Sequence, residues 1–168
     1  MTKKVALIGY GGIAHDAVEA LQKAKADIHL VGALCEPGCT AQARAALPGI
    51  AIVESLSDLL ALRPDVVAEV ASQSALALFG PDILTRGVDL LVISIGGLAE
   101  PKLLASLKAA AERGNGRILL PAGAIGGVDA IAAMRLGGLH AVRYRSRPRL
   151  TREVQPGLES SECIVGAV

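Results

Sequence analysis

The chain is poor in aromatic residues, which make up 2% of its 168 residues. It contains Tyr10, Phe79 and Tyr144 and no tryptophan. This scarcity argues against base-stacking platforms, aromatic cages and immunoglobulin-like sandwiches, all of which depend on aromatic side chains. Hydrophobic residues nevertheless reach 52%, so the sequence is not that of a disordered chain. We expect a folded core built from alanine, valine, leucine and isoleucine.

The sequence also lacks a strong charge imbalance and long apolar runs. Its formal net charge is +1, which gives no reason to expect a nucleic acid or another polyanion as partner. Uncharged stretches such as Val70–Pro81 and Leu90–Ala99 are too short to span a bilayer. No basic segment followed by an apolar one opens the chain, so secretion is not indicated. We therefore expect a cytoplasmic protein without a membrane partner.

Cysteine is scarce as well, and its spacing does not match a metal site. Cys35 and Cys39 stand close together, but neither a second cysteine pair nor a suitably spaced histidine follows. We predict no metal and interpret Cys35, Cys39 and Cys163 as buried or partly buried reduced thiols.

Buried strands alternate with helices along the first 120 residues. The predicted strands are Val5–Ile8, Ile28–Leu34, Ile50–Val53, Val66–Ala71, Val88–Ile95 and Arg117–Leu120. The predicted helices are Gly11–Lys25, a short one capped by Ser57-Asp58 and ending at Leu62, Ser74–Arg86 with an interruption at Gly80-Pro81, and Pro101–Arg113. This alternation predicts an α/β fold, a Rossmann-type doubly wound parallel sheet with right-handed crossovers.

The pattern changes after the last of these strands. Residues 128–136 favour a helix that Gly137-Gly138 ends, and residues 140–149 alternate like a strand. We interpret residues 1–121 as a dinucleotide-binding domain and 122–168 as the start of a second α+β domain, a partial or truncated substrate and dimerisation domain. The alternating arginines, Arg143 to Arg149, either grip a dicarboxylate or protect a solvated edge strand, and the second interpretation is favoured.

The most informative motif follows the first strand. Gly9-Tyr10-Gly11-Gly12-Ile13-Ala14 fits the pattern G-x-G-x-x-G/A at the point where a strand turns into a helix. Gly9 permits the tight turn, Gly11 lets the backbone approach a pyrophosphate, and Ala14 lets the helix pack close to the strand. The unpaired amides at the helix N-terminus favour an anionic group. We predict that these six residues bind a dinucleotide; the alternative is a tight turn alone.

Glu36 stands where the second strand should end. A carboxylate there accepts hydrogen bonds from the adenosine ribose of NAD and repels the 2′-phosphate of NADP. We therefore expect NAD or NADP as cofactor, with NAD slightly favoured. The other possibility is that Glu36 is a solvated loop residue.

The rest of the cofactor wall should come from the loops that follow the fourth and fifth strands. We predict contacts from Ala71 in the first loop and from Ser94 and Gly96 in the second. Glu69 is unusual, because a buried strand rarely carries an unpaired carboxylate. It either forms local hydrogen bonds at the strand end, which is favoured, or contacts a ligand directly.

Several segments together resemble the L-aspartate dehydrogenase family. They are the glycine fingerprint, Glu69-Val70-Ala71, Ser94-Ile95-Gly96-Gly97-Leu98 and, most specifically, the stretch Pro121-Ala122-Gly123-Ala124-Ile125-Gly126-Gly127-Val128-Asp129-Ala130. The resemblance covers roughly residues 3–147.

That resemblance implies an NAD(P)-dependent oxidoreductase acting on a CH–NH2 group. The family oxidises L-aspartate to iminoaspartate, which hydrolyses to oxaloacetate and ammonia or feeds NAD biosynthesis, and its members are usually homodimers. It also implies that Ala122, Gly123, Ala124 and Ile125 lie near the substrate. On backbone grounds alone, that segment is equally a helix entry whose glycines allow close packing.

The chain departs from the family after about residue 147. Members continue for roughly another hundred residues, which supply a catalytic histidine; none of His15, His29 and His140 corresponds to it. The catalytic residue is therefore unassigned. The alternative function is a non-catalytic NAD(P)-binding domain or a truncated fragment without that histidine.

Overall fold

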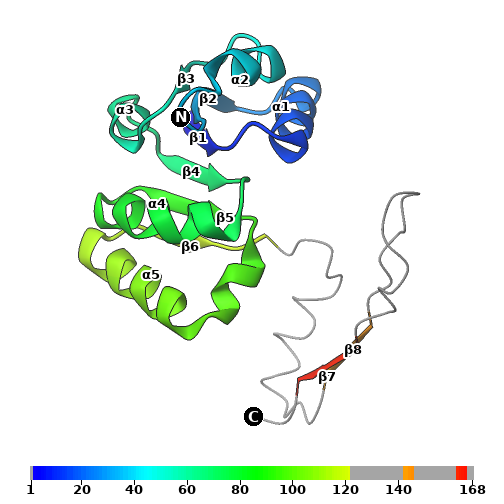
Figure 1. Ribbon diagram of the computed structural model, residues 1–168, viewed down its shortest axis with the longest axis vertical. Coiled ribbons are helices and arrows are strands. Elements are labelled where there is room, and N and C mark those ends of the chain that lie inside the picture. The colour runs from blue at the N-terminus through cyan, green and yellow to red at the C-terminus, as the bar shows by residue number, and fades with distance from the viewer. Residues whose placement is uncertain (1, 122–141, 146–161, 166–168) are drawn as a thin grey trace. The chain divides into compact units, whose positions relative to one another are not determined.

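The computed structural model describes residues 2–121, 142–145 and 162–165 (Figure 1). Contacts between Cα atoms divide the chain into two compact units, Met1–Pro121 and Ala122–Val168. Each unit is described by itself below. No helix in these ranges is both long enough and apolar enough to cross a bilayer.

The first unit is built on a parallel sheet whose strands follow the order β3-β2-β1-β4-β5-β6. This order, with its reversal between β1 and β4, is that of a doubly wound nucleotide-binding sheet. The strands are β1 (Lys3–Ile8), β2 (Ile28–Leu34), β3 (Ile52–Val53), β4 (Val66–Glu69), β5 (Asp89–Val92) and β6 (Ile118–Leu119). The predicted Rossmann-type fold class is confirmed.

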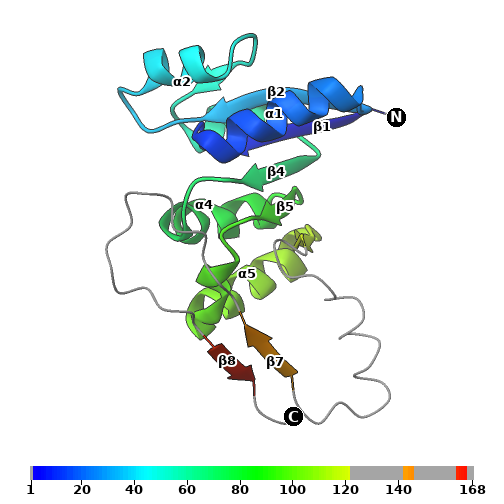
Figure 2. The same cartoon turned by 90° about the vertical axis from the view of Figure 1, so that its right-hand side faces the viewer.

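Helices connect consecutive strands and cover both faces of the sheet (Figures 1 and 2). They are α1 (Gly12–Ala24), α2 (Thr40–Ala46), α3 (Leu56–Ala61), α4 (Gln73–Thr85) and α5 (Pro101–Gly114), together with a 3-10 helix η1 (Ile95–Ala99) between β5 and α5. Pro101 occupies the first turn of α5, where its missing amide proton leaves no hydrogen bond unmade.

Side chains that alternate along the strands divide the core into two clusters. Ala6 and Ile8 of β1 point to the face that holds the buried residues of α3, α4 and α5, such as Leu59, Leu76 and Leu107. Leu7 points to the opposite face, where it packs with residues of α1 and α2. Both faces are therefore buried, which explains why these strands read as continuous apolar runs.

Four local predictions need correction. The sequence predicts neither helix α2 nor η1; of the residues of η1, only Ile95 falls in a predicted strand, and most of the others fall in the loop predicted to follow it. Ser55, not Ser57-Asp58, caps α3: its hydroxyl accepts the Asp58 amide proton and donates to the Asp58 carboxylate. Helix α4 runs unbroken through Pro81, with buried core residues on both sides of the proline.

In the second unit, the structure describes the backbone of one antiparallel strand pair. Strand β7 (Val142–Arg145) pairs with β8 (Glu162–Val165), so that Arg143 lies opposite Ile164 and Arg145 opposite Glu162. A strand was predicted around β7, over residues 140–149, whereas β8 was not predicted. The helix predicted over residues 128–136 and the residues Ala122, Gly123, Ala124 and Ile125 lie outside the described residues.

An ion pair joins the beginnings of β5 and β6. The Asp89 carboxylate accepts the backbone amide proton of Arg117 at 2.9 Å and pairs with its guanidinium at 2.6 Å. The guanidinium lowers the pKa of Asp89 below its usual value. The ionised aspartate therefore contributes stability above pH 4, and this contribution is lost as the pH falls through the lowered pKa of the folded state.

We predict that Asp89→Asn lowers the free energy of unfolding by about 1 kcal/mol at pH 7. Because the asparagine cannot titrate, the variant should also lose part of the stability change that the parent chain shows below about pH 4. Urea unfolding at a series of pH values measures both effects. Asp82→Asn, at an exposed position of α4, is the control and should leave the pH profile unchanged. An Asp89→Asn profile parallel to the parent's would contradict the assignment.

Candidate functional site

The glycine fingerprint forms a sharp turn between β1 and α1. Gly9 has a φ of 105°, a left-handed conformation that favours glycine. Its amide donates to the Leu34 carbonyl at 2.9 Å, which ties the turn to the end of β2. A Cβ atom at Gly9 would lie 3.0 Å from the Cβ of Ala71. Gly9 is therefore required both by its own backbone and by the close approach of the loop after β4.

The N-terminus of α1 carries no side-chain cap. Gly11 is the N-cap residue, no acidic residue lies in the first turn, and the first helical bond of the segment runs from His15 to the Gly11 carbonyl. By contrast, side chains of Ser55, Ser72 and Glu100 cap α3, α4 and α5. The first amides of α1 therefore lack an intrahelical acceptor, and the positive end of the helix dipole is open to an anionic ligand.

A cavity of about 610 Å³ lies beside this turn. It brings together Gly9, Tyr10, Gly11, Glu36 and Ala71, which were predicted to bind the cofactor from three separate segments of the sequence. The other lining residues are Ile8, Leu34, Cys35, Pro37, Glu54, Val70, Ser72, Ser74, Ala75, Leu78 and Phe79. The cavity thus lies at the carboxyl ends of β1, β2 and β4, where the strand order reverses.

The end of the cavity formed by the loops after β2 and β3 is acidic. Glu36 and Glu54 both line it and both are exposed, and none of the lining residues that the structure describes is a lysine or an arginine. Glu54 accepts hydrogen bonds from the Thr40 hydroxyl and from the Gly38 amide at 3.1 Å, and these bonds lower its pKa. A hydroxyl donor fits this end better than a phosphate.

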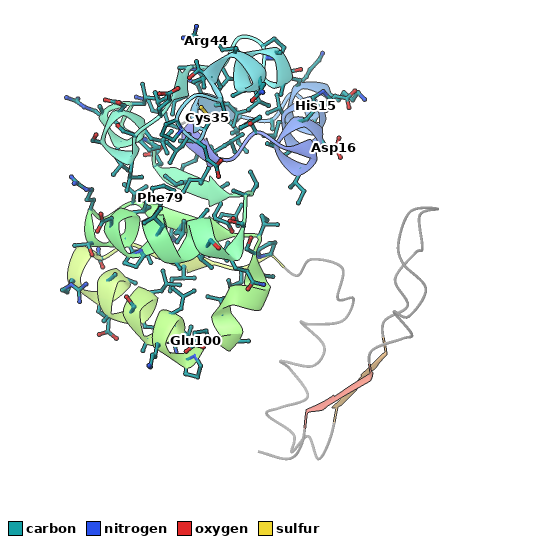
Figure 3. All side chains as sticks on the ribbon, in the orientation of Figure 1. His15, Asp16, Cys35, Arg44, Phe79 and Glu100 are labelled. Carbon is teal, nitrogen blue, oxygen red and sulfur yellow. The ribbon has the colours of Figure 1, made fainter. Side chains whose placement is uncertain are left out.

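The two described cysteines lie beside the fingerprint. Cys35 is buried at the end of β2 and Cys39, at the N-terminus of α2, is partly exposed; both are free thiols, as predicted. The interaction with the Cys39 thiol raises the pKa of the Tyr10 hydroxyl, which favours its neutral form. Figure 3 shows Cys35 within the sheet layer.

Among the lining residues that the sequence analysis did not predict, three determine the character of the cavity. Leu78 and Phe79 of α4 supply an apolar wall, and Leu78 is 69% exposed, unusually open for a leucine. Glu54 supplies the second carboxylate. Glu54 follows β3 as Glu36 follows β2, and this position at a strand end is the sequence signal that could have identified it.

Glu69 adopts the structural role that the sequence favoured. Its side chain is fully buried and accepts hydrogen bonds from the amides of Ala71 and Ser72, and from both the amide and the hydroxyl of Ser94. A side chain without exposed surface cannot touch a ligand, so the direct-ligand alternative is wrong.

The remaining predicted residues lie around the cavity without lining it. Gly12 and Ile13 are exposed at the start of α1, and Ala14 is buried against the sheet. Ser94 lies at the end of β5, where it is bonded to Glu69, and Gly96 lies in η1 beside the Gln73 side chain. Among residues 2–121, both histidines lie outside the cavity lining; Figure 3 shows His15 projecting outward from α1. No cluster of metal-ligating side chains occurs in the described parts of the chain.

The comparison with protein families agrees with this geometry. Residues 9–121 match the model of the NAD-binding domain of homoserine dehydrogenase. The chain belongs to the homoserine dehydrogenase NAD-binding domain family.

Curated relatives of this NAD-binding domain carry the name L-aspartate dehydrogenase. The protein from Ruegeria pomeroyi is 40% identical over 144 residues, which are 86% of this chain and 50% of the relative. L-aspartate dehydrogenase 2 from Bordetella pertussis is 41% identical over 148 residues, 88% of this chain and 55% of the relative. The chain thus spans about half the length of these relatives.

Solved structures share the fold. Aspartate dehydrogenase from Thermotoga maritima superposes with a TM-score of 0.63 at 22% identity, over 80% of this chain and 52% of that one. The WlbA dehydrogenase from Bordetella pertussis, solved in complex with NADH and UDP-GlcNAcA, gives a TM-score of 0.66 at 18% identity, over 83% and 42% of the two chains.

The two glycines of the turn should respond differently to substitution. A Cβ at Gly11 would meet no atom within 4 Å, and the φ of −72° suits any residue. We expect Gly11→Val to fold with the parent's stability but to weaken NADH binding by about a hundredfold, because the side chain fills the approach of the pyrophosphate. NADH titration by fluorescence and thermal unfolding measure the two properties.

Gly9→Ala is the matched control. Alanine at this position would have to adopt a left-handed backbone and would crowd Ala71. The substitution should therefore lower the free energy of unfolding by about 1–3 kcal/mol. A Gly11→Val variant that binds NADH as tightly as the parent would show that the turn is not the phosphate site.

Proposed function

We propose that this chain is the cofactor-binding part of an NAD(P)-dependent L-aspartate dehydrogenase. The observation that carries the proposal is the uncapped N-terminus of α1 facing a cavity at the switch point of the sheet. The identity of about 40% with proteins named L-aspartate dehydrogenase supports the substrate. The reaction would oxidise the C–N bond of L-aspartate to an imine, which water converts to oxaloacetate and ammonia.

The residues of the first unit would bind and orient the cofactor. The backbone amides of Gly11, Gly12 and Ile13 would hold the pyrophosphate, and Ala14 would let α1 approach the sheet. The adenosine would lie between the loop after β2 and the apolar wall formed by Leu78 and Phe79. When bound, the nicotinamide ring supplies the acceptor for a hydride from the substrate Cα. By the strand order, this ring would lie toward Ser94 and Gly96.

NAD is proposed over NADP because of the charges at the adenosine end. Glu36 and Glu54 line that end, and within residues 2–121 no cationic side chain lines the cavity. A 2′-phosphate would meet two carboxylates there, whereas a ribose hydroxyl can donate a hydrogen bond to Glu36.

The other features of the whole enzyme are proposed on the family resemblance. They include residues 122–168 as part of a substrate and dimerisation domain, with Ala122, Gly123, Ala124 and Ile125 near the substrate. They also include a homodimeric state, a cytoplasmic location and a supply of iminoaspartate to NAD biosynthesis. The second candidate function is a domain that binds NAD(P) without turnover; it is favoured because neither histidine of residues 2–121 lines the cavity.

One experiment separates these functions. The purified chain, of confirmed mass, is titrated with NADH and with NADPH and then assayed for reduction of NAD or NADP in the presence of L-aspartate. Binding with aspartate-dependent turnover supports the dehydrogenase, and binding without turnover supports the non-catalytic domain. Failure to bind either NADH or NADPH contradicts both.

The cofactor preference has a test of its own in Glu36→Gln, which keeps the size of the side chain and removes its charge. We expect the ratio of NADPH to NADH dissociation constants to fall by about tenfold, which corresponds to about 1.4 kcal/mol of like-charge repulsion. Titration with both dinucleotides measures the ratio. Glu54→Gln is the comparison variant and should change the ratio less, because Glu54 is already engaged by Thr40 and Gly38. An unchanged ratio in Glu36→Gln would contradict the assigned role.

A further inference from the structure

The one buried charged side chain of residues 2–121 lies beneath the proposed cofactor site. Glu69 is the last residue of β4 and is fully buried. A buried carboxylate is unfavourable unless hydrogen bonds replace the water that it has lost. The Glu69 carboxylate accepts four hydrogen bonds, and every donor belongs to a loop at the carboxyl end of the sheet.

The two oxygens of Glu69 hold different loops. Oε1 accepts the amide protons of Ala71 at 2.9 Å and Ser72 at 2.8 Å, in the loop between β4 and α4, as well as the Ser94 hydroxyl at 3.0 Å. Oε2 accepts only the backbone amide proton of Ser94, at 3.0 Å. The carboxylate thus joins the end of β4 to the end of β5.

The first of these loops touches the phosphate turn. Ala71, held by Oε1, is the residue against which Gly9 packs. Ser72, held by the same oxygen, caps α4 through its hydroxyl. The position of Glu69 therefore sets how closely the loop after β4 approaches the glycine turn, and where α4 and its apolar wall begin.

The second loop leads to the nicotinamide side. Ser94 immediately precedes η1. Within η1, Gly96 lies against the Gln73 side chain, and a Cβ atom added at Gly96 would lie 2.7 Å from the Gln73 Nε2 atom. In the strand order, β5 lies beyond β4 from the adenosine end of the cavity. The Ser94 loop is thus placed where the second nucleotide of a dinucleotide would extend.

We propose that Glu69 is a positioning residue of the cofactor site, which aligns the Ser94 loop with the glycine turn before the dinucleotide binds. This proposal rests on the proposed function, because it assigns the nicotinamide half of the cofactor to the Ser94 loop. Glu69 itself does not touch the cofactor. It acts through the backbone that it holds, and this preorganisation spares the bound state the ordering of a free loop.

Glu69→Gln separates the two halves of the network. With the amide oxygen at the position of Oε1, the bonds from Ala71, Ser72 and the Ser94 hydroxyl are kept, while the amide NH2 faces the Ser94 amide, donor against donor. The reverse orientation would break the two bonds from the Ala71 and Ser72 amides instead of one, because the Ser94 hydroxyl can turn to accept a proton from the NH2 group. The substitution should therefore release the Ser94 backbone selectively and leave the adenosine end formed.

We expect Glu69→Gln to weaken NADH binding by about tenfold, the effect of one buried donor left without an acceptor. The affinity for ADP, which probes the adenosine and diphosphate only, should stay within about twofold of the parent's, since its amide contacts are kept. NADH and ADP titrations, performed well below the melting temperature of each variant, measure this difference.

Asp89→Asn is the matched control. It makes the same carboxylate-to-amide change at the other end of β5, where Asp89 also accepts a backbone amide proton. It should lower stability without changing the ratio of NADH to ADP affinity. A Glu69→Gln variant that binds both ligands like the parent, or that loses both by the same factor, would overturn the positioning role. If the parent binds neither ligand, the proposed function itself fails.

Hydrogen exchange of the parent chain gives a second test that needs no variant. The amides of Ala71, Ser72 and Ser94 should be protected in the absence of cofactor, because Glu69 already holds them. A Ser94 amide that exchanges freely until NADH is added would overturn the proposal, even if Glu69→Gln failed to fold.

Discussion

The backbone of Gly9 lies against Ala71, and the geometry of the candidate site depends on this close approach. It brings the turn after β1 and the loop after β4 together at the edge where the strand order reverses. A glycine with a φ of 105° makes the contact possible from one side. From the other side, the Ala71 amide is fixed by the buried Glu69 carboxylate. Without the glycine at position 9 or the hydrogen bond from the Ala71 amide to Glu69, the two loops would not enclose the cavity beside the first turn of α1.

The cavity is electrically polarised along its length. The open N-terminus of α1 supplies positive partial charge at its centre, while Glu36 and Glu54 supply negative charge at one end. Such a site accepts a ligand whose anionic groups are central and whose terminal groups donate hydrogen bonds. A dinucleotide has this order of groups, with its diphosphate between two ribose rings.

The features encoded in short segments could be predicted from the sequence. The residues from Gly9 to Ala14 specify the turn and the start of the helix by their own sequence. The strands could be recognised as continuous apolar runs because both faces of the sheet are buried. Helix α2 could not be predicted in this way. It has seven residues and no side-chain cap, so its sequence contains neither a long periodic pattern nor a signal for the start of a helix.

Features that depend on contacts across the chain could not be predicted. The sequence alone leaves two roles open for Glu69, because its partner Ser94 lies 25 residues away. The same holds for Leu78 and Phe79, which line the cavity because α4 packs against β4 and β5 with this part of the helix at the cavity. A helical pattern shows which residues are apolar, but not which of them face a ligand site.

A crystal structure of the chain with NADH tests the central claim most directly. The diphosphate should lie within hydrogen-bond distance of the backbone amides of Gly11, Gly12 and Ile13, with the adenosine ribose beside Glu36. Density for the dinucleotide elsewhere, with the N-terminus of α1 left in contact with solvent alone, would contradict the account.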